Sequence, residues 1–499
     1  MKPVVTAAEM RALDRATIDD VGIPAFTLME TAGRGVAEVA MQTISWSRTD
    51  RVAVVCGPGN NGGDGFVAAR VLLGHDIDAC AYLTVPRDKI KGDASAHLAI
   101  LERAGGIVRM ADTPERLDTV RDEIEHAALV IDAVFGIGLE RTIEGHFAEV
   151  IATINRARER LALDIPSGLH TDTGRTLGVA VDAQRTVTMA ALKPALAGAP
   201  GFARAGQIDV IDIGVPPGVL ATQGVCAGLV EDRDVASWLP KIAAMDHKGT
   251  RGHVLVIGGM PGMRGAGRLA SIAALRAGAG LVTLASADDP TADDSVMTRS
   301  ISGDLGSVLE RKAAILIGPG LGTSAEAQRW VDQVLACGVP AVLDADALRD
   351  PAAIAKAAGP IVITPHPGEA ARLLGTTADA IEADRFAAAR ALAAKTRAVV
   401  VLKGARTIVC DGTLRDDFCS INPTGGPSLG TGGSGDVLAG AIAALLAQQL
   451  SPHDAARAAV FVHGRAGDNL ANIHGERGVV SSDLPLAIAG ALREIPRPA

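Results

Sequence analysis

The sequence predicts an α/β protein that is built from two doubly wound domains. Short apolar runs alternate with helical patterns, and each run is followed by a loop rich in Gly, Asp or Ser, which is the rhythm of βαβ units. This rhythm stops around residues 215–235 and then starts afresh. Because a chain of 499 residues is too long for one core of about 150 residues, two domains are expected.

The composition is that of a globular protein without a nucleic-acid partner. Hydrophobic residues make up 48% of the chain, charged residues 21% and aromatic residues 2%, so Ala, Val, Leu and Ile must build the cores. A formal net charge of −9 gives no basic surface that could neutralise a phosphate backbone. The 57 glycines recur beside short apolar runs, which favours a nucleotide-handling protein.

The sequence shows no pattern typical of secretion or of a membrane span. Its opening, MKPVVTAAEM, lacks the basic and then apolar pattern of a signal peptide, and no charge-free apolar run reaches about 18 residues. The cysteines are scattered and include no CxxC pair: Cys56, Cys80, Cys226, Cys337, Cys410 and Cys419. A reducing cytoplasm is therefore the expected location.

The first half begins with a helical segment and continues with buried strands. The pattern TAAEMRALDRATIDD predicts a helix over residues 6–20. RVAVVC, ALVIDAV and LALDIP predict buried parallel strands over residues 51–56, 128–134 and 161–166. We assign residues 1–220 to this domain.

A proline-containing and weakly periodic stretch, VPPGVLATQGVCAGLVEDRD, marks the domain boundary. We predict a linker over residues 221–230 and a second domain over residues 231–499. In this domain HVLVIGG, at residues 253–259, restarts the βα rhythm. The further predicted strands are LVTLAS, AAILIG, PAVLDA, PIVITP and AVVVLKG, at residues 281–286, 313–318, 340–345, 360–365 and 398–404.

The segment VCGPGNNGGDG contains a formal dinucleotide fingerprint. Gly57, Gly59 and Gly62 match GxGxxG between a strand and a helix, but a lone match of this kind is weak. The acidic residue that normally ends the second strand and binds a ribose hydroxyl is absent, because IDACAYLTV ends in Leu, Thr and Val. An ordinary NAD-dependent dehydrogenase is therefore disfavoured.

Polar side chains gather where the strands of the first half end. Asn60, Asn61 and Asp64 lie in the glycine loop at the start of a helix, where ligands dock. Asp132 and Asp164 end two other strands, and the carboxyl ends of parallel strands converge on one crevice. Each aspartate could instead cap the turn that follows it, and Asn60 could be a turn residue. The agreement of three strand ends favours a functional crevice.

The oxygen atoms at these strand ends suit a hard cation. Side-chain oxygens of Asn61, Asp132 and Ser167, together with nearby backbone carbonyls, would form an oxygen-only cation site. Asp164 is then left to act as a catalytic acid or base.

The motifs NNGGDG, IDAVFGIGLERT and LALDIPSGL together resemble the N-terminal YjeF family, the NAD(P)H-hydrate epimerases, over about residues 1–220. The resemblance implies a Rossmann-like fold and a potassium ion held by Asn61, Asp132 and Ser167, with Asp164 contacting the hydrated nicotinamide ring. It also implies that the hydrated dinucleotide is bound by Asn60, Asn61, Gly62, Gly63, Asp64, Gly136, Ile137, Gly138, Leu139, Glu140, Arg141 and Thr142.

The predicted strands of the second half also end in glycine-rich or polar segments, namely GPGLG at residues 318–322, LDADAL, TPHPGE, and KGART at residues 403–407. His366 stands between two prolines in a rigid turn, so its ring can be fixed toward a ligand. The alternative is a histidine with a structural role only. For Asp344 and Asp346, roles as caps or loop anchors are equally open.

The segment GTGGSGD, residues 430–436, joins a glycine loop to an Ala- and Leu-rich helix. The N–H groups of Gly433, Ser434 and Gly435 would point at a phosphate, assisted by the helix dipole. Asp436 could be a helix cap, but a cap needs no such length of bare backbone. If a phosphoryl group moves to a substrate hydroxyl, Asp436 can accept the proton of that hydroxyl. The loop lacks GxxxxGK[ST] and is not a P-loop.

GTGGSGD, together with NPTG, TPHPGE and GPGLG, resembles the ribokinase-like superfamily and, within it, the NAD(P)H-hydrate dehydratases, over about residues 231–499. That family often has Asn where Gly426 stands and Ala where Gly430 stands. The resemblance implies that the hydrate is bound by Ala266, Gly320, His366 and Asp436, and that the nucleotide is bound by Lys403, Gly404, Ala405, Arg406, Thr407 and Gly435.

Together the two resemblances imply a bifunctional repair enzyme. The first domain would interconvert the epimers of hydrated NADH or NADPH, and the second would dehydrate the S epimer while ADP becomes AMP, with magnesium as a plausible counter-ion. We expect small-molecule substrates, a homo-oligomer, and neither nucleic-acid nor membrane partners. Two alternatives are an ATP-dependent kinase of a small alcohol that carries an N-terminal nucleotide sensor, and a non-catalytic nucleotide-binding scaffold.

Overall fold

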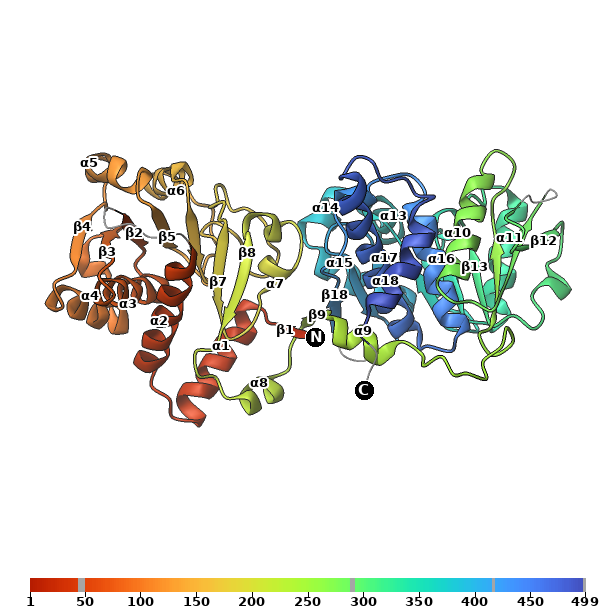
Figure 1. Cartoon of the computed structure of the whole chain (residues 1–499), viewed down its shortest axis with the longest axis horizontal. Helices are drawn as coiled ribbons and strands as arrows, with labels where there is room; N and C mark the ends of the chain where they lie inside the picture. The colour runs from red at the N-terminus through yellow and green to blue at the C-terminus, as the bar shows by residue number, and fades with distance from the viewer. Residues whose placement is uncertain (44–49, 288–291, 415–417, 497–499) are drawn as a thin grey trace. The chain divides into compact units, whose positions relative to one another are not determined.

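The computed structural model describes residues 1–43, 50–287, 292–414 and 418–496 (Figure 1). The chain divides into two compact units, Lys2–Cys226 and Ala227–Ala499, and Met1 belongs to the second. This division lies inside the predicted linker, but the segment differs from a simple linker because it contains the end of helix α8 and the strand β9. Three residues, AGL, form β9 and are too few to give a strand pattern.

The first unit contains a sheet of parallel strands in the order β4-β3-β2-β5-β6-β7-β8. The strands are β2 (Arg51–Cys56), β3 (Asp78–Leu83), β4 (Ile107–Met110), β5 (Leu129–Ala133), β6 (Arg160–Leu163), β7 (Arg185–Met189) and β8 (Gln207–Ile211). The chain winds outward from β2 to β4, then returns to β5 and continues in the other direction. This is the doubly wound order of a Rossmann-like sheet, so the predicted fold class is confirmed, and the switch point lies between β2 and β5.

Helices cover both faces of this sheet. They are α1 (Ala7–Arg15), η1 (Ala16–Asp20), α2 (Ala25–Thr43), α3 (Asn60–Gly74), α4 (Gly92–Arg103), α5 (Pro114–Glu125), α6 (His146–Arg156), α7 (Pro194–Ala197) and α8 (Pro217–Gln223). Val54 packs in a core with α2, α3 and α4, whereas its neighbour Val55 packs on the other face with α5 and α6. A continuous apolar strand therefore serves two cores at once.

The second unit contains a sheet that runs from β9 to β12 in the order β9-β18-β17-β16-β15-β14-β13-β10-β11-β12. Neighbours are parallel except that β17 is antiparallel to both β16 and β18. The chain direction reverses between β10 and β13, which again defines a switch point. The strands are β9 (Ala227–Leu229), β10 (His253–Ile257), β11 (Leu281–Ser286), β12 (Met297–Ser300), β13 (Ala314–Ile317), β14 (Ala341–Leu343), β15 (Ile361–Ile363), β16 (Val399–Leu402), β17 (Ile408–Asp411) and β18 (Cys419–Ile421).

The core of the second unit is rich in alanine and depends on close helix contacts. Helix α16 is almost completely buried and packs against α10, where a Cβ atom added at Gly440 would lie 2.1 Å from the carbonyl oxygen of Ala270. The helices are α9 (Asp232–Trp238), α10 (Arg264–Arg276), α11 (Ala325–Ala336), α12 (Pro351–Ile354), α13 (Pro367–Leu374), α14 (Ala378–Ala383), α15 (Arg385–Thr396), α16 (Ser434–Ala447), α17 (Pro452–His474) and α18 (Leu484–Glu494). Within the described residues, none of the helices is long and apolar enough to cross a lipid bilayer.

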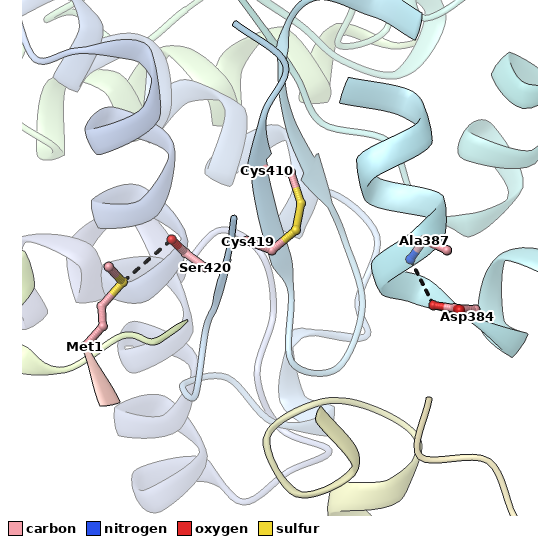
Figure 2. The surroundings of a disulfide bond; sticks show 6 residues. All are labelled: Met1, Asp384, Ala387, Cys410, Cys419 and Ser420. Carbon is pink, nitrogen blue, oxygen red and sulfur yellow. Dashed lines mark hydrogen bonds between the residues drawn. A yellow bond between two sulfur atoms is a disulfide. The ribbon is translucent and has the colours of Figure 1, made fainter. Parts of the chain in front are cut away.

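A disulfide joins Cys410 of β17 to Cys419 of β18, as Figure 2 shows. The two residues are direct partners in the antiparallel register, with Cα atoms 4.6 Å apart. This disulfide was not predicted, because the register of a hairpin cannot be derived from a spacing of nine residues. The bridge fastens the hairpin that follows the KGART segment and precedes the NPTG segment.

Candidate active sites

The first site is a pocket of about 510 Å³ at the switch point between β2 and β5. Its wall includes these predicted residues: Asn60, Asn61, Asp64, Gly136, Ile137, Gly138, Leu139 and Asp164. Gly62 and Gly63 are buried in the first turn of α3. Glu140, Arg141 and Thr142 are exposed and do not line the pocket, so the structure separates them from the other predicted residues.

The glycines of this site allow close backbone approach. A Cβ atom added at Gly57 would lie 1.9 Å from the carbonyl oxygen of Val134. One added at Gly136 would lie 2.9 Å from Asp164 Oδ2 and 3.0 Å from Asn61 Oδ1. Gly136 therefore permits the carboxylate and the amide oxygen to converge on one stretch of backbone, as a substrate pocket requires.

Asp164 lies directly after β6 and is held by several donors. Lys193 Nζ donates to its Oδ1 at 2.8 Å and Thr188 Oγ1 donates to the same atom at 3.2 Å. The N–H group of Ile137 donates to Oδ2 at 3.3 Å. Lys193, which was not predicted as a site residue, is buried after β7 and also lines the pocket. Recognition of RTVTM as a strand would have placed this lysine at the same sheet edge.

Two further carboxyl groups face this ion pair. Burial raises the pKa of Asp64 well above its usual range, and the charges of Asp164 and Asp14 add to the shift. Burial also raises the pKa of Asp14, while Lys193 opposes the rise. The pocket thus combines one lysine with carboxyl groups of different proton affinity, a pattern typical of acid–base centres.

Of the three residues predicted for the cation, Asn61 lines the pocket, whereas Asp132 and Ser167 do not. Asp132 is fully buried, its Oδ1 accepts from Ser167 Oγ at 2.6 Å and its Oδ2 accepts from the N–H of Ser167 at 2.8 Å. Burial raises the pKa of Asp132 to about 6, against the effect of these hydrogen bonds. In the described part of the chain the buried amide nitrogen of Asn61 has no hydrogen-bond partner. A buried carboxylate without a cationic partner, beside hydroxyl and amide oxygens, fits a monovalent cation.

Lys403 is the centre of the second site. Its Nζ donates to Asp344 Oδ1 at 2.8 Å and lies 3.9 Å from Glu369 Oε2. A Cβ atom added at Gly435 would lie 3.3 Å from the same nitrogen. Burial lowers the pKa of Lys403, but the carboxylates of Asp344, Glu369 and Asp436 outweigh it and the pKa is raised. The structure therefore brings the KGART and GTGGSGD segments together around one permanent positive charge.

Asp436 lies in the first turn of α16, as the sequence predicted. Gly433 precedes the helix with a φ of 94° and supplies no side-chain cap. The carboxylate of Asp436 makes no hydrogen bond in the described part of the chain, so the helix-cap alternative is disfavoured. Burial raises the pKa of Asp436 to about 6, Asp344 adds to the rise, and Lys403 opposes it. The N–H of Ser434, which was predicted to point at a phosphate, instead donates to the carbonyl of Thr431 at 3.3 Å. The carboxylate of Asp436 beside it is available to a substrate.

His366 has a structural role, which was one of the two alternatives that the sequence left open. Its Nδ1 accepts from the N–H groups of Gly368 at 3.0 Å and Glu369 at 3.4 Å, and Glu369 Oε2 accepts from the N–H of His366 at 2.8 Å. This is a reciprocal cap of α13. More than half of the His366 side chain is exposed, and its Nε2 lies 3.5 Å from Glu369 Oε1.

Gly320 and Ala266 adjoin each other near the switch point of the second sheet. Gly320 has a φ of 57°, and a Cβ atom added there would lie 3.2 Å from the Cβ of Ala266. The carbonyl of Gly320 accepts from the N–H of Met260 at 2.8 Å, which ties the GPGLG loop to the loop after β10. These two predicted hydrate contacts are thus brought together.

The predicted nucleotide segment is shaped by a buried arginine. Arg385 donates to the carbonyl oxygens of Leu402 at 3.3 Å and Lys403 at 3.1 Å. Thr407 Oγ1 donates to the carbonyl of Gly404 at 2.9 Å, which closes the loop on itself. Lys403 to Thr407 therefore form a defined turn at the end of β16.

The two departures from the resembled pattern leave the backbone unstrained. Gly426 has a φ of −114° and Gly430 a φ of −74°, which other residues also adopt. A Cβ atom added at Gly426 would have no neighbour closer than 3.5 Å. The backbone angles at neither position require glycine, but a Cβ atom added at Gly430 would lie 3.1 Å from the carbonyl oxygen of Pro427 and would need a small shift there.

The fold and the two sites define a two-domain α/β enzyme with an acid–base centre in each domain. The family described as YjeF-related protein N-terminus matches residues 25–195, and the family described as NAD(P)H-hydrate dehydratase matches residues 254–489. The chain belongs to the family of bifunctional NAD(P)H-hydrate repair enzymes, as its relatives show. The "Bifunctional NAD(P)H-hydrate repair enzyme Nnr" of Moorella thermoacetica is 41% identical over 96% of this chain and 95% of its own.

A second curated relative agrees with this assignment. The protein of the same name from Escherichia coli is 35% identical over 96% of this chain and 92% of its own. Among solved structures, the ADP/ATP-dependent NAD(P)H-hydrate dehydratase from Bacillus subtilis, co-crystallised with ATP and Mg²⁺, is 29% identical and covers 53% of this chain and 98% of its own, with a TM-score of 0.48.

Proposed function

We propose that the two sites act in sequence on hydrated nicotinamide cofactors. The enzyme is a bifunctional NAD(P)H-hydrate epimerase and dehydratase. The first domain interconverts the R and S epimers of NADHX or NADPHX, and the second converts the S epimer back to NADH or NADPH. The observation that carries the assignment of the second site is the unbound carboxylate of Asp436 beside Lys403 and Gly435.

Epimerisation requires a bond at the hydroxylated ring carbon to break and to re-form on the other face. A proton must be taken up and returned during this exchange, and we assign this role to Asp164. Lys193 orients the Asp164 carboxylate through its 2.8 Å hydrogen bond. Asn60 to Asp64 and Gly136 to Thr142 are the proposed contacts of the dinucleotide.

Asn61, Asp132 and Ser167 would hold potassium next to this pocket, where the ion supplies a fixed positive charge. Potassium chloride is then expected to raise the thermal unfolding midpoint of the first domain above its value in lithium chloride at equal ionic strength. A ligand at 100 times its Kd stabilises a native state by about 2.7 kcal/mol. Differential scanning calorimetry of the full chain measures this, with Asp132→Asn as the variant that loses the effect. Equal midpoints in both salts would contradict the site.

Dehydration begins with transfer of a phosphoryl group. The ring hydroxyl attacks the β-phosphorus of ADP, its proton passes to Asp436, and the bond to the bridging oxygen breaks to release AMP. Lys403 and the N–H groups at the start of α16 stabilise the charge of the moving group. The C–O bond of the phosphorylated hydrate then breaks, phosphate leaves, and a proton leaves the neighbouring ring carbon to restore the ring.

Lys403 to Thr407 and Gly435 are the proposed nucleotide contacts, and Ala266, Gly320, His366 and Asp436 are those of the hydrate. The described residues contain no group of three or more His, Cys, Asp or Glu side chains that could hold a metal, so any Mg²⁺ would arrive with the nucleotide phosphates. A homo-oligomeric state and a cytoplasmic location stay predictions of the sequence.

Incubation of the purified protein with NADHX and ADP is expected to restore the absorbance of reduced nicotinamide. AMP and phosphate should each appear in equal amount to the NADH formed. The same protein incubated with ATP and small alcohols tests the kinase alternative. Absence of any absorbance gain, with a phosphorylated alcohol as product, would overturn the repair function.

A further inference from the structure

A hollow of about 290 Å³ beside the second site contains positive charge that the reaction above does not use. Its wall consists of Thr323, Asp346, Arg349 and Arg372. Thr323 follows the GPGLG loop, Asp346 and Arg349 follow β14, and Arg372 belongs to α13. Since two guanidinium groups face one carboxylate, the hollow favours an anion.

The guanidinium of Arg349 is held in place by backbone oxygens. Its Nε donates to the carbonyl of Asp346 at 2.7 Å and its Nη2 donates to the carbonyl of Gly322 at 2.6 Å. Arg372 Nη2 makes one long contact of 3.4 Å to the carbonyl of Leu348. Within the described residues neither arginine forms an ion pair with a carboxylate. Each has unused N–H donors in the planar arrangement that suits phosphate oxygens.

The hollow lies closer in the sheet to the proposed hydrate contacts than to the proposed nucleotide contacts. It lies at the ends of β13, β14 and β15, which also carry Gly320 and His366, the proposed hydrate contacts. The proposed nucleotide segment Lys403 to Thr407 follows β16, one strand further along the sheet. Asp346 Oδ2 accepts from the N–H of Gly322 at 2.8 Å, which joins the wall of the hollow to the loop of Gly320.

We propose that Thr323, Arg349 and Arg372 bind phosphate oxygens of the hydrated dinucleotide and thereby anchor it while its ring reaches Asp436. This inference rests on the dehydratase function proposed above. Two phosphate sources share the required chemistry: the pyrophosphate, present in both NADHX and NADPHX, and the 2′-phosphate, present in NADPHX alone.

Arg372→Gln is the cleaner test, because Arg372 is exposed and has one weak backbone contact. Removal of a charge-assisted hydrogen bond is expected to raise the KM for the hydrate by about tenfold or more. The kcat and the KM for ADP should stay near the wild-type values, since binding away from the reacting atoms is lost equally in ground and transition states. Arg372→Lys should retain part of the affinity. Arg299→Gln on β12, an equal charge change at an exposed site, should leave both constants unchanged.

NADHX and NADPHX are assayed separately with each variant. An increase of KM for both hydrates supports the proposal and assigns the pyrophosphate, whereas an increase for NADPHX alone supports it and assigns the 2′-phosphate. Unchanged hydrate KM values, or an increase confined to ADP, overturn it. Wild-type protein that fails to turn over either hydrate would instead reject the dehydratase function, so the two failures are distinguishable. Arg349→Gln, checked by thermal unfolding for an intact fold, repeats the test from the other wall.

Discussion

Replacement of Asp436 by asparagine is expected to abolish hydrate dehydration while ADP binding and epimerisation persist. Asparagine has the size of aspartate but cannot accept the hydroxyl proton, and general-base catalysis contributes about 10²- to 10⁴-fold in rate. The Asp436 side chain makes no hydrogen bond in the described part of the chain, so its replacement breaks none, and Lys403 keeps its hydrogen bond to Asp344. The loss of activity should therefore occur without a loss of stability.

Three measurements on the same preparation check this result: NADH formation, ADP binding by calorimetry, and the equilibration of R and S epimers. The wild-type dehydration rate should also fall as pH decreases through about 6, because burial raises the Asp436 pKa to about 6 and the protonated carboxyl group cannot act as a base. The residual dehydration rate of the Asp436→Asn variant should not fall as the pH decreases through about 6. Equal loss of all three properties would indicate misfolding and contradict the assignment.

Replacement of Asp164 by asparagine is expected to stop epimerisation and to leave dehydration of the S epimer unchanged. The variant removes the group that exchanges the proton, and it leaves the buried Lys193 without its ionic partner. Loss of one member of a buried ion pair costs about 3–5 kcal/mol, so the first domain should also become less stable. Asp164→Asn combined with Lys193→Met should recover stability but not epimerisation, which separates the chemical role from the structural one.

A mixture of both epimers, supplied with an excess of ADP, makes the result visible in one assay. Wild-type enzyme should consume the whole mixture, whereas the Asp164→Asn variant should stop when the S epimer is exhausted, apart from slow spontaneous exchange. Continued rapid consumption of the R epimer would contradict the role of Asp164. It would favour a first domain that senses nucleotides without catalysis.

Interior strands such as β2 and β11 could be predicted because they are buried on both faces. RVAVVC and LVTLAS were predicted at residues 51–56 and 281–286, and the structure has β2 and β11 with those bounds. Their largely apolar runs leave little ambiguity once each run is followed by a loop rich in Gly or Asp. The grouping of Asn61, Asp132 and Asp164 near one crevice followed from strand ends alone, since parallel strands end at the same edge.

The rest depends on contacts that sequence patterns do not encode. β7 reads as RTVTM because Thr186 and Thr188 are buried with their hydroxyls bonded to Ala205 and Asp164, so an apolar scan passes over the strand. Lys193 was missed for the same reason. The exposed positions of Glu140 to Thr142 are set by the path of a loop, which neither hydropathy nor spacing determines.

The left-handed backbone of Asp164, with a φ of 69°, has a consequence for protein engineering. A non-glycine residue in this region costs on the order of 1 kcal/mol, and the fold tolerates that cost at the position that exchanges the proton. Any search for thermostable variants that ranks substitutions by backbone preference will therefore favour glycine at this position. Such a variant would relieve the backbone cost but would leave the buried Lys193 without its ionic partner, and it would no longer carry the carboxylate that we assign to epimer exchange. Residue 164 should therefore be held constant when this enzyme is stabilised for use as a cofactor-recycling reagent.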